Sequence, residues 1–345
     1  MHVECRAAPD AATRRAVGTS TRCGVASPRV IDGRRKSKSK SADRRRGECM
    51  QLASWNVRSL VNASGPVETA FVRKNSNFRN SNFEFDKDDR RVDVVVGELK
   101  RLDKEVAGLQ ETRWFGEEVY SVGDSAVLST RWRLPSGDGS FLRGACVAVV
   151  LRGRALRAWR DRGSQWAPVL PRLTVAVLRF VSGRSRKSVN LHVIACYAPT
   201  FRAKRSVMDS FFNDLQRAIQ DVPGEDKFVL LGDLNARVGS RQSGIADDWQ
   251  GVRGLHGFVE YNESGAELLL FLHMNDAAVC NTWFQKRAFH KQSWQYPRTK
   301  QWHAIDFIIM HHKDRRLCRD CRVVLNGDCG SDHRMVCLTV QLRQM

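Results

Sequence analysis

Apolar and polar positions alternate along the chain in a way that predicts mixed strands and helices from Met50 onward. Apolar or alternating runs of strand length predict strands, and they lie at 51–57, 106–110, 125–129, 145–151, 173–180, 189–197, 228–231, 278–281, 304–310 and 335–342. Apolar residues that recur every three or four positions predict helices, which lie at 88–104, 203–220 and 264–273. Helices mixed with this many strands predict an α/β fold in which two sheets pack together and helices cover their outer faces.

Three segments break this pattern. Residues 62–87 are rich in Asn, Ser and Phe and predict an irregular insertion, and residues 239–261 predict a long Gly-rich loop. Residues 1–49 are rich in Arg, Ser, Ala and Lys and poor in large apolar side chains. Such a segment cannot offset the conformational entropy lost on folding. We therefore expect a disordered basic tail at 1–49 followed by one domain at 50–343.

The chain is strongly basic. Its 57 Lys and Arg against 37 Asp and Glu give a formal net charge of +20, of which residues 1–50 carry +8. Positive charge favours a polyanionic partner, because side chains that neutralise phosphates release condensed counterions. Charge alone leaves an anionic membrane surface, or no specific partner, as alternatives. The basic runs at 34–40 and 44–46 fit a nuclear-import or nucleic-acid tail, or a merely solvated leader, and a nuclear location is the expectation.

The ten cysteines are scattered along the chain rather than densely spaced. Cys318 and Cys321 form a C-x-x-C pair, but the obvious partners for a four-ligand zinc site lie singly in predicted strands and loops. Reduced, buried thiols are therefore expected, which implies an intracellular compartment. The sequence has no apolar signal core, and no apolar run approaches the ~18 residues that span a bilayer. We expect a protein without a membrane partner.

Polar side chains with catalytic potential follow several of the apolar runs. They are Asn56, Glu111, Asp233, Asn235, Asp306, Asp332 and His333. Each alone is compatible with a turn or a helix cap. Acids that interrupt buried strands must nevertheless be paired, hydrogen-bonded or bound to metal. Several carboxylates and amides with a single His predict a site for Mg²⁺, or Mn²⁺, rather than zinc. Such a site suits phosphodiester hydrolysis, which requires charge neutralisation, a base and donors to the phosphate oxygens.

These motifs resemble the endonuclease/exonuclease/phosphatase superfamily in order and spacing. The motifs are Trp55-Asn56, Leu109-Gln110-Glu111, Tyr197-Ala198-Pro199, Gly232-Asp233-Leu234-Asn235, Ile305-Asp306-Phe307 and Ser331-Asp332-His333. More narrowly, the chain resembles the endonuclease domain of RTE-type non-LTR retrotransposons and the related craniofacial development protein 2-like proteins. The narrower resemblance is carried by residues 54–60, 108–114, 193–200, 262–265, 281–284 and 290–294.

The resemblance implies a DNase I-like four-layer α/β-sandwich, with two mixed β-sheets flanked by helices, and a role for each motif residue. Asn56, Glu111 and Asp332 would bind the divalent metal, and Tyr197 would bond the scissile phosphate or its leaving group. Asp233 would position or deprotonate water, and Asn235 would hold a non-bridging oxygen. Asp306 would pair with His333, which would stabilise the transition state. Whether Asp233 or the Asp306–His333 pair is the base is left open.

The same resemblance implies Mg²⁺-dependent nicking of double-stranded DNA, leaving a 3′-hydroxyl and a 5′-phosphate without a small-molecule cofactor. Trp294 and Arg298 would contact DNA, although a core aromatic and a solvated cation are equal alternatives. Two rival functions are a phosphatase of the same superfamily and an inactive domain that binds nucleic acid or chromatin.

Three features depart from the family pattern, the first being that residues 62–91 separate the first two motifs more than in the shortest family members, although related retroelement sequences carry a similar insertion. The expected Gly-x-Gly hairpin reads Gly144-Ala145-Cys146. A chain ending soon after Ser-Asp-His leaves no room for a reverse transcriptase. That ending suggests a domesticated endonuclease, a fragment of an element, or a decayed copy.

Overall fold

The computed structural model describes residues 49–60, 90–114, 118–130, 146–181, 188–240 and 249–341. The predicted tail (except Cys49), the insertion at 62–87, and Gly144 and Ala145 lie outside the described residues. Within the described part, no helix is long and apolar enough to cross a membrane.

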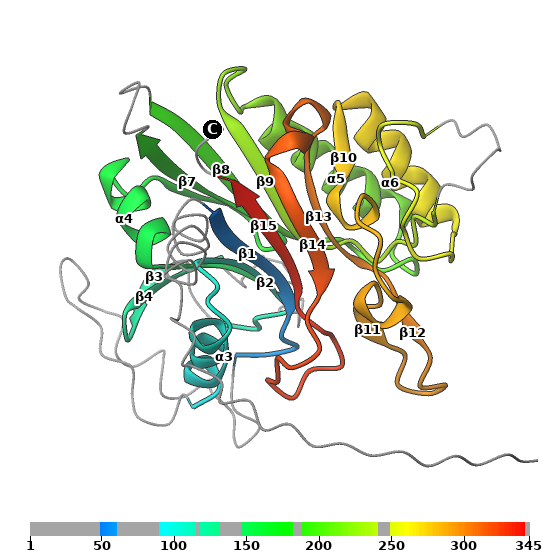
Figure 1. The fold of residues 1–345 in the computed structure, drawn as a ribbon, viewed down its shortest axis with the longest axis horizontal. Helices are drawn as coiled ribbons and strands as arrows, with labels where there is room; N and C mark the ends of the chain where they lie inside the picture. Colours follow the sequence, from blue (N-terminus) through cyan, green and yellow to red (C-terminus); the bar gives the residue numbers. More distant parts are fainter. Residues whose placement is uncertain are drawn as a thin grey trace, which may run out of the picture. The chain divides into compact units, whose positions relative to one another are not determined.

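The strands form two large mixed sheets and one two-stranded ribbon (Figure 1). The seven-stranded sheet has the order β14-β15-β1-β2-β5-β4-β3, and the six-stranded sheet has the order β10-β13-β9-β8-β7-β6. Their bounds are β1 Cys49–Asn56, β2 Val106–Gln110, β3 Glu118–Val122, β4 Ser125–Ser129, β5 Val147–Arg152, β6 Trp166–Leu170, β7 Leu173–Val181, β8 Ser188–Tyr197, β9 Lys227–Asp233, β10 Ala277–Val279, β13 Asp306–His311, β14 Cys318–Val323 and β15 Val336–Gln341. The ribbon pairs β11 Trp294–Gln295 with β12 Trp302–His303. Each large sheet contains one parallel pair, β1 with β2 and β8 with β9.

A central core lies between the two sheets. Leu52 and Val149 of the seven-stranded sheet belong to the same buried cluster as Val193 and Leu231 of the six-stranded sheet. Helix α4, Gly153–Asp161, adds its own buried face to this cluster. Because β-strand side chains alternate between the two faces of a sheet, the intervening positions point outward and need separate cover.

Helices supply that cover on both outer faces. Helix α3, Arg90–Arg101, packs with Trp55 and Leu109 on the outside of the seven-stranded sheet. Helices α5, Arg205–Gln220, and α6, Glu263–Met274, pack with outward-facing residues of β8 and β9. The order helix, sheet, sheet, helix confirms the predicted four-layer α/β-sandwich.

Several elements differ from the apolar pattern. The predicted helix at 88–104 ends at Arg101, since the left-handed backbone of Asp103, with φ of 55°, cannot continue a helix. The predicted strand at 278–281 ends at Val279, where a 3-10 turn, Cys280–Thr282, takes over. Strands β3, β6, β11, β12 and β14 and helix α4 were not predicted.

The two sheets are in tight contact at Gly108, and this contact predicts a stability effect. A Cβ atom at Gly108 would lie 2.6 Å from Cβ of Leu231 and 3.3 Å from Cβ of Ala195 in the opposite sheet. Overpacking a filled core costs about 1–3 kcal/mol, so we expect Gly108→Ala to lower the free energy of unfolding by about that amount. Gly97→Ala in α3, where nothing lies within 4 Å of the added atom, should instead stabilise by about 0.5–1 kcal/mol. Chemical denaturation of both variants tests the pair, and equal effects would contradict this packing.

Candidate active site

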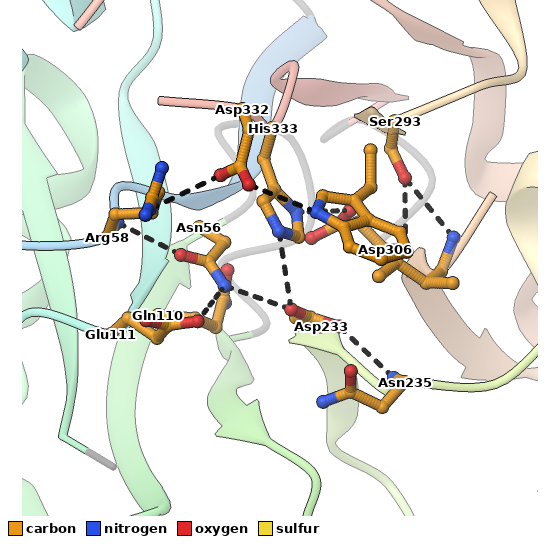
Figure 2. Close-up of polar contacts among 12 residues, drawn as sticks. Asn56, Arg58, Gln110, Glu111, Asp233, Asn235, Ser293, Asp306, Asp332 and His333 are labelled. Carbon is orange, nitrogen blue, oxygen red and sulfur yellow. Dashed lines mark hydrogen bonds and ion pairs between the residues drawn. The ribbon is translucent and has the colours of Figure 1, made fainter. Parts of the chain in front are cut away.

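Strand topology brings the predicted residues to one end of the sandwich. Asn56 ends β1, and Glu111 directly follows the parallel neighbour β2. In the other sheet, Tyr197 at the end of β8 is in register with Asp233 at the end of parallel β9. Asp306 begins β13, which runs antiparallel to β9 and pairs with Asp233. Both sheets therefore deliver their polar strand ends to the same edge, as Figure 2 shows for the residues it labels.

Asn56 links the two sheets through its side-chain amide. Its Nδ2 donates to Oε1 of Glu111 at 3.0 Å and to Oδ2 of Asp233 at 2.9 Å. Its Oδ1 accepts the backbone N–H of Arg58 at 3.0 Å. The hydroxyl of Tyr197 donates to the same Glu111 Oε1 at 2.9 Å. One Glu111 oxygen thus receives two hydrogen bonds, while the other lies 3.1 Å from Nη2 of Arg113.

Asp233, Asp306 and His333 form a buried cluster beside this link. Nδ1 of His333 lies 3.0 Å from Oδ2 of Asp306, and its Nε2 lies 4.0 Å from Oδ2 of Asp233. Burial, and then the charge of Asp306, raise the pKa of the Asp233 carboxyl well above its ordinary value. Burial by itself lowers the pKa of His333, but the carboxylates of Asp306, Asp233 and Asp332 outweigh that effect and raise it to about 9. The raised pKa favours the protonated form of the imidazole between these carboxylates.

Tyr197 is positioned as a hydrogen-bond donor. Burial, followed by the carboxylates of Asp233 and Glu111, raises the pKa of its phenol above the ordinary value. The hydroxyl therefore keeps its proton at neutral pH.

The loop that carries His333 is fixed from both sides. The Ser331 hydroxyl donates to the backbone oxygen of Asn56 at 2.7 Å and accepts the N–H of His333 at 3.1 Å. Oδ2 of Asp332 accepts the indole N–H of Trp294 at 3.2 Å, and its Oδ1 lies 3.6 Å from Nε of Arg58. Asp332 thus faces Arg58 and Trp294 rather than Glu111, and its prediction as a metal ligand stays a prediction.

Asn235 has the left-handed backbone that a tight turn after β9 requires, with φ of 48°. Its N–H donates to Oδ1 of Asp233 at 3.1 Å, and its Nδ2 donates to the backbone oxygen of Ala198 at 2.9 Å. The turn fixes one carboxylate oxygen of Asp233 and the start of the segment that follows β8.

The two predicted DNA contacts lie in different surroundings. Trp294 is half-buried, with its ring centroid 6.0 Å from that of His333, so it supports the site loop. Arg298 is exposed between β11 and β12. DNA contact by either residue stays a prediction.

Two further residues belong to the site and were not given roles from the sequence. Nη1 of Arg172 donates to the backbone oxygen of Tyr197 at 3.3 Å, and its guanidinium lies 5.1 Å from the Tyr197 ring centroid. The fully buried Ser293 hydroxyl accepts the backbone N–H groups of Ile305 and Asp306, each at 3.2 Å. Arg172 brings positive charge beside Tyr197, and Ser293 positions Asp306.

The donor set fits a hard divalent cation. Asp233, Asp306 and His333 each offer a ligand atom, and these atoms lie within 4.8 Å of one another. Oδ1 of Asp306 is buried without a hydrogen-bond partner, whereas Oδ1 of Asp332 is compensated by the Arg58 guanidinium at 3.6 Å. Carboxylate oxygens left without a partner suit Mg²⁺ or Mn²⁺.

The cysteines show no comparable arrangement. In the part of the chain described, no group of three or more potential metal ligands includes a cysteine. Burial raises the pKa of Cys280 and Cys321, which agrees with the predicted reduced, buried thiols.

Comparisons with curated proteins and with solved structures identify proteins that are similar to this chain. The "Craniofacial development protein 2" of Bos taurus is 28% identical over 253 residues, which is 73% of this chain and 39% of that protein. The chain therefore spans about two fifths of the length of this curated relative. The AP endonuclease LMAP from Leishmania major aligns with a TM-score of 0.54 at 11% identity, covering 87% of this chain and 90% of that one. The endonuclease domain of TRAS1, a telomere-specific non-LTR retrotransposon, aligns with a TM-score of 0.46 at 14% identity, covering 73% and 93%.

The sequence profile described as "Endonuclease/Exonuclease/phosphatase family" matches residues 53–333, from β1 to the loop that carries His333. This match covers more than half of the chain and confirms the resemblance inferred from the motifs. The chain belongs to the endonuclease/exonuclease/phosphatase family.

Proposed function

We propose that this protein is a Mg²⁺-dependent phosphodiesterase that nicks double-stranded DNA and leaves a 3′-hydroxyl and a 5′-phosphate. The proposal rests chiefly on one observation, the Asn56 amide that joins Glu111 of one sheet to Asp233 of the other. A carboxylate, an amide, a phenol and an Asp–His pair around one point supply the groups that phosphodiester hydrolysis needs. The fold that the chain shares with the AP endonuclease LMAP is in line with this proposal.

Each residue in the site has a distinct proposed role. Glu111 with Asn56 and Asp332 would hold Mg²⁺, which neutralises phosphate charge and lowers the pKa of bound water.

The roles of the other site residues are proposed from the atoms that face the buried cluster of Asp233, Asp306 and His333. Asp233, with one oxygen fixed by Asn235 and the other by Asn56, would orient the attacking water. His333 uses Nδ1 to bond Asp306, so its Nε2 faces Asp233 and would donate to a phosphate oxygen. The Tyr197 hydroxyl and the Asn235 amide would donate to phosphate oxygens. From the sequence the general base is Asp233 or the Asp306–His333 pair, and the raised pKa of His333, which favours the protonated imidazole, favours Asp233.

We propose DNA as the partner because the protein is strongly basic. The formal net charge of +20 includes +12 outside residues 1–50, and Arg58 and Arg113 lie at the site itself. We propose a nuclear location because of this positive charge and because the proposed substrate is DNA.

Binding is expected to weaken steeply with salt. Neutralising about five or more phosphates predicts a loss of about a hundredfold or more in affinity between 50 and 200 mM salt. Titration of a labelled duplex at several salt concentrations measures the slope. A slope near zero would contradict backbone recognition by basic side chains.

Nicking of supercoiled plasmid with Mg²⁺, Mn²⁺ or EDTA tests the activity. We expect metal-dependent conversion to open circle and ends that a ligase can reseal, since ligation requires a 3′-hydroxyl and a 5′-phosphate. DNA binding without nicking would favour an inactive binding domain. Phosphate release from small phosphate esters without nicking would favour a phosphatase.

A further inference from the structure

The segment between β8 and α5 presents an aromatic side chain to solvent. The N–H of Ala203 donates to the oxygen of Thr200 at 2.9 Å, which closes a turn with Phe201 and Arg202 at its corner. Phe201 is 74% exposed, more than any other aromatic residue in the described part of the chain. Single exposed apolar side chains are common on protein surfaces, so the role of this ring is inferred from its place beside the candidate site and from the charges next to it.

This turn, here called the Phe201 turn (residues 200–203), is anchored at the candidate active site. The N–H of Ala198 donates to the backbone oxygen of Asp233 at 2.9 Å. The oxygen of Ala198 accepts Nδ2 of Asn235, also at 2.9 Å. Both backbone groups of Ala198 are thus bonded to the turn after β9, two residues before the Phe201 turn begins.

Strand order places the Phe201 turn on one flank of the site. In the six-stranded sheet, β9 lies between β8 and β13. The Phe201 turn follows β8, whereas the β11–β12 ribbon precedes β13. Asp233 at the end of β9 therefore lies between the end of β8, which leads to the Phe201 turn, and the start of β13, which the ribbon precedes, and a duplex that extends along the sheet edge from Asp233 would meet the Phe201 turn on one side.

The positively charged side chains beside the Phe201 ring indicate which class of molecule would bind there. The Arg202 guanidinium lies 5.5 Å from the Phe201 ring centroid, and Lys204 in the same segment is exposed. An aromatic face with cations next to it suits a nucleobase and its phosphate, because every base has a π-face for stacking.

We propose that Phe201 stacks on a nucleobase next to the phosphodiester to be cut, with Arg202 on a neighbouring phosphate, so that DNA with an unpaired base at that position is the preferred substrate. This inference rests on the proposed nuclease function. In a paired duplex each base already stacks on its neighbours, and exposing a base costs least where it is mismatched or unpaired. Phe201 therefore stacks on a base at little cost only where that base is mismatched or unpaired.

Cleavage rates on two matched duplexes test the preference. One duplex is fully paired, and the other carries one unpaired 2-aminopurine nucleotide within two nucleotides of the nick mapped on the first. We expect the wild type to cut the second faster by about tenfold, the scale of one base–aromatic stack. Phe201→Ala and Phe201→Leu should bring this ratio close to one, whereas Phe201→Trp should keep it. The matched control is Met274→Ala, since Met274 is 71% exposed at the end of α6, and it should leave the ratio unchanged.

Binding without cleavage provides a second measurement. In EDTA, stacking of the unpaired 2-aminopurine on Phe201 should quench its fluorescence in the wild type and in Phe201→Trp, but not in Phe201→Ala. Quenching without nicking, measured with the unpaired 2-aminopurine at the centre of a duplex of the same length, would keep the stacking of Phe201 on an unpaired base and overturn the proposed enzyme. Nicking with an equal ratio in wild type and Phe201→Ala, or equal quenching in both, would overturn this inference and keep the enzyme.

Discussion

Glu111→Gln is expected to abolish most metal-dependent nicking, by about a hundredfold to a thousandfold or more. The substitution keeps the size of the side chain and leaves an oxygen that can still accept from Asn56 and Tyr197. It removes the negative charge that a divalent cation requires and adds an N–H₂ group beside Arg113, which lies 3.1 Å from the carboxylate. The fold should be preserved, so the loss should appear in turnover at saturating Mg²⁺.

Two controls separate metal binding from a general loss of charge. Glu267→Gln removes an acid that pairs with Arg205 on the surface between α5 and α6, and it should leave nicking unchanged, since such pairs contribute only about 0–1 kcal/mol. A ligand that binds only the folded state raises its stability, so Mg²⁺ should raise the melting temperature of the wild type more than that of Glu111→Gln. Nicking by Glu111→Gln within a few-fold of the wild type would rule out Glu111 as the principal metal ligand.

Much of the fold was predictable because its central strands have clear apolar patterns. Strands β2 and β4 match the predicted ranges 106–110 and 125–129, and every residue of both is buried. The missed strands lie mostly at sheet edges, where one face is solvated and the pattern is weak. Strand β14 reads Cys-Arg-Asp-Cys-Arg-Val and contains a register shift. Strand β6 contains Pro168, which cannot donate to the ladder.

The candidate site was predictable where its residues interrupt apolar strands, and not elsewhere. Asp233 and Asp306 are recognisable because an acid in such a position must be compensated. Arg172 gives no such signal, since an Arg beside a strand is usually solvated. Its place beside Tyr197 depends on the register of β7 with β8, in which Leu173 opposes Cys196. The role of Ser293 also could not be predicted from the sequence, because its hydroxyl accepts hydrogen bonds from the backbone N–H groups of residues 305 and 306, which are distant in the chain.

Asp306 and His333 are expected to act as one unit, so that their substitutions do not multiply. His333→Ala removes the only side chain that bonds Asp306 in this cluster and should lower the nicking rate by about a hundredfold to a thousandfold, the cost of losing one transition-state donor.

Asp306→Asn retains the side-chain shape and the backbone bond to Ser293, but it no longer holds the imidazolium. We expect a loss of about a hundredfold to ten-thousandfold. Because Asp306 acts through His333, the double variant should be no slower than the slower single variant, as for other residues that work together. Single-turnover rates of the wild type and the three variants complete the cycle, with thermal melting of each to verify folding. If the losses of the two single variants multiply in the double variant, Asp306 acts independently of His333. Its Oδ1, which is buried without a hydrogen-bond partner, would then be assigned as a metal ligand.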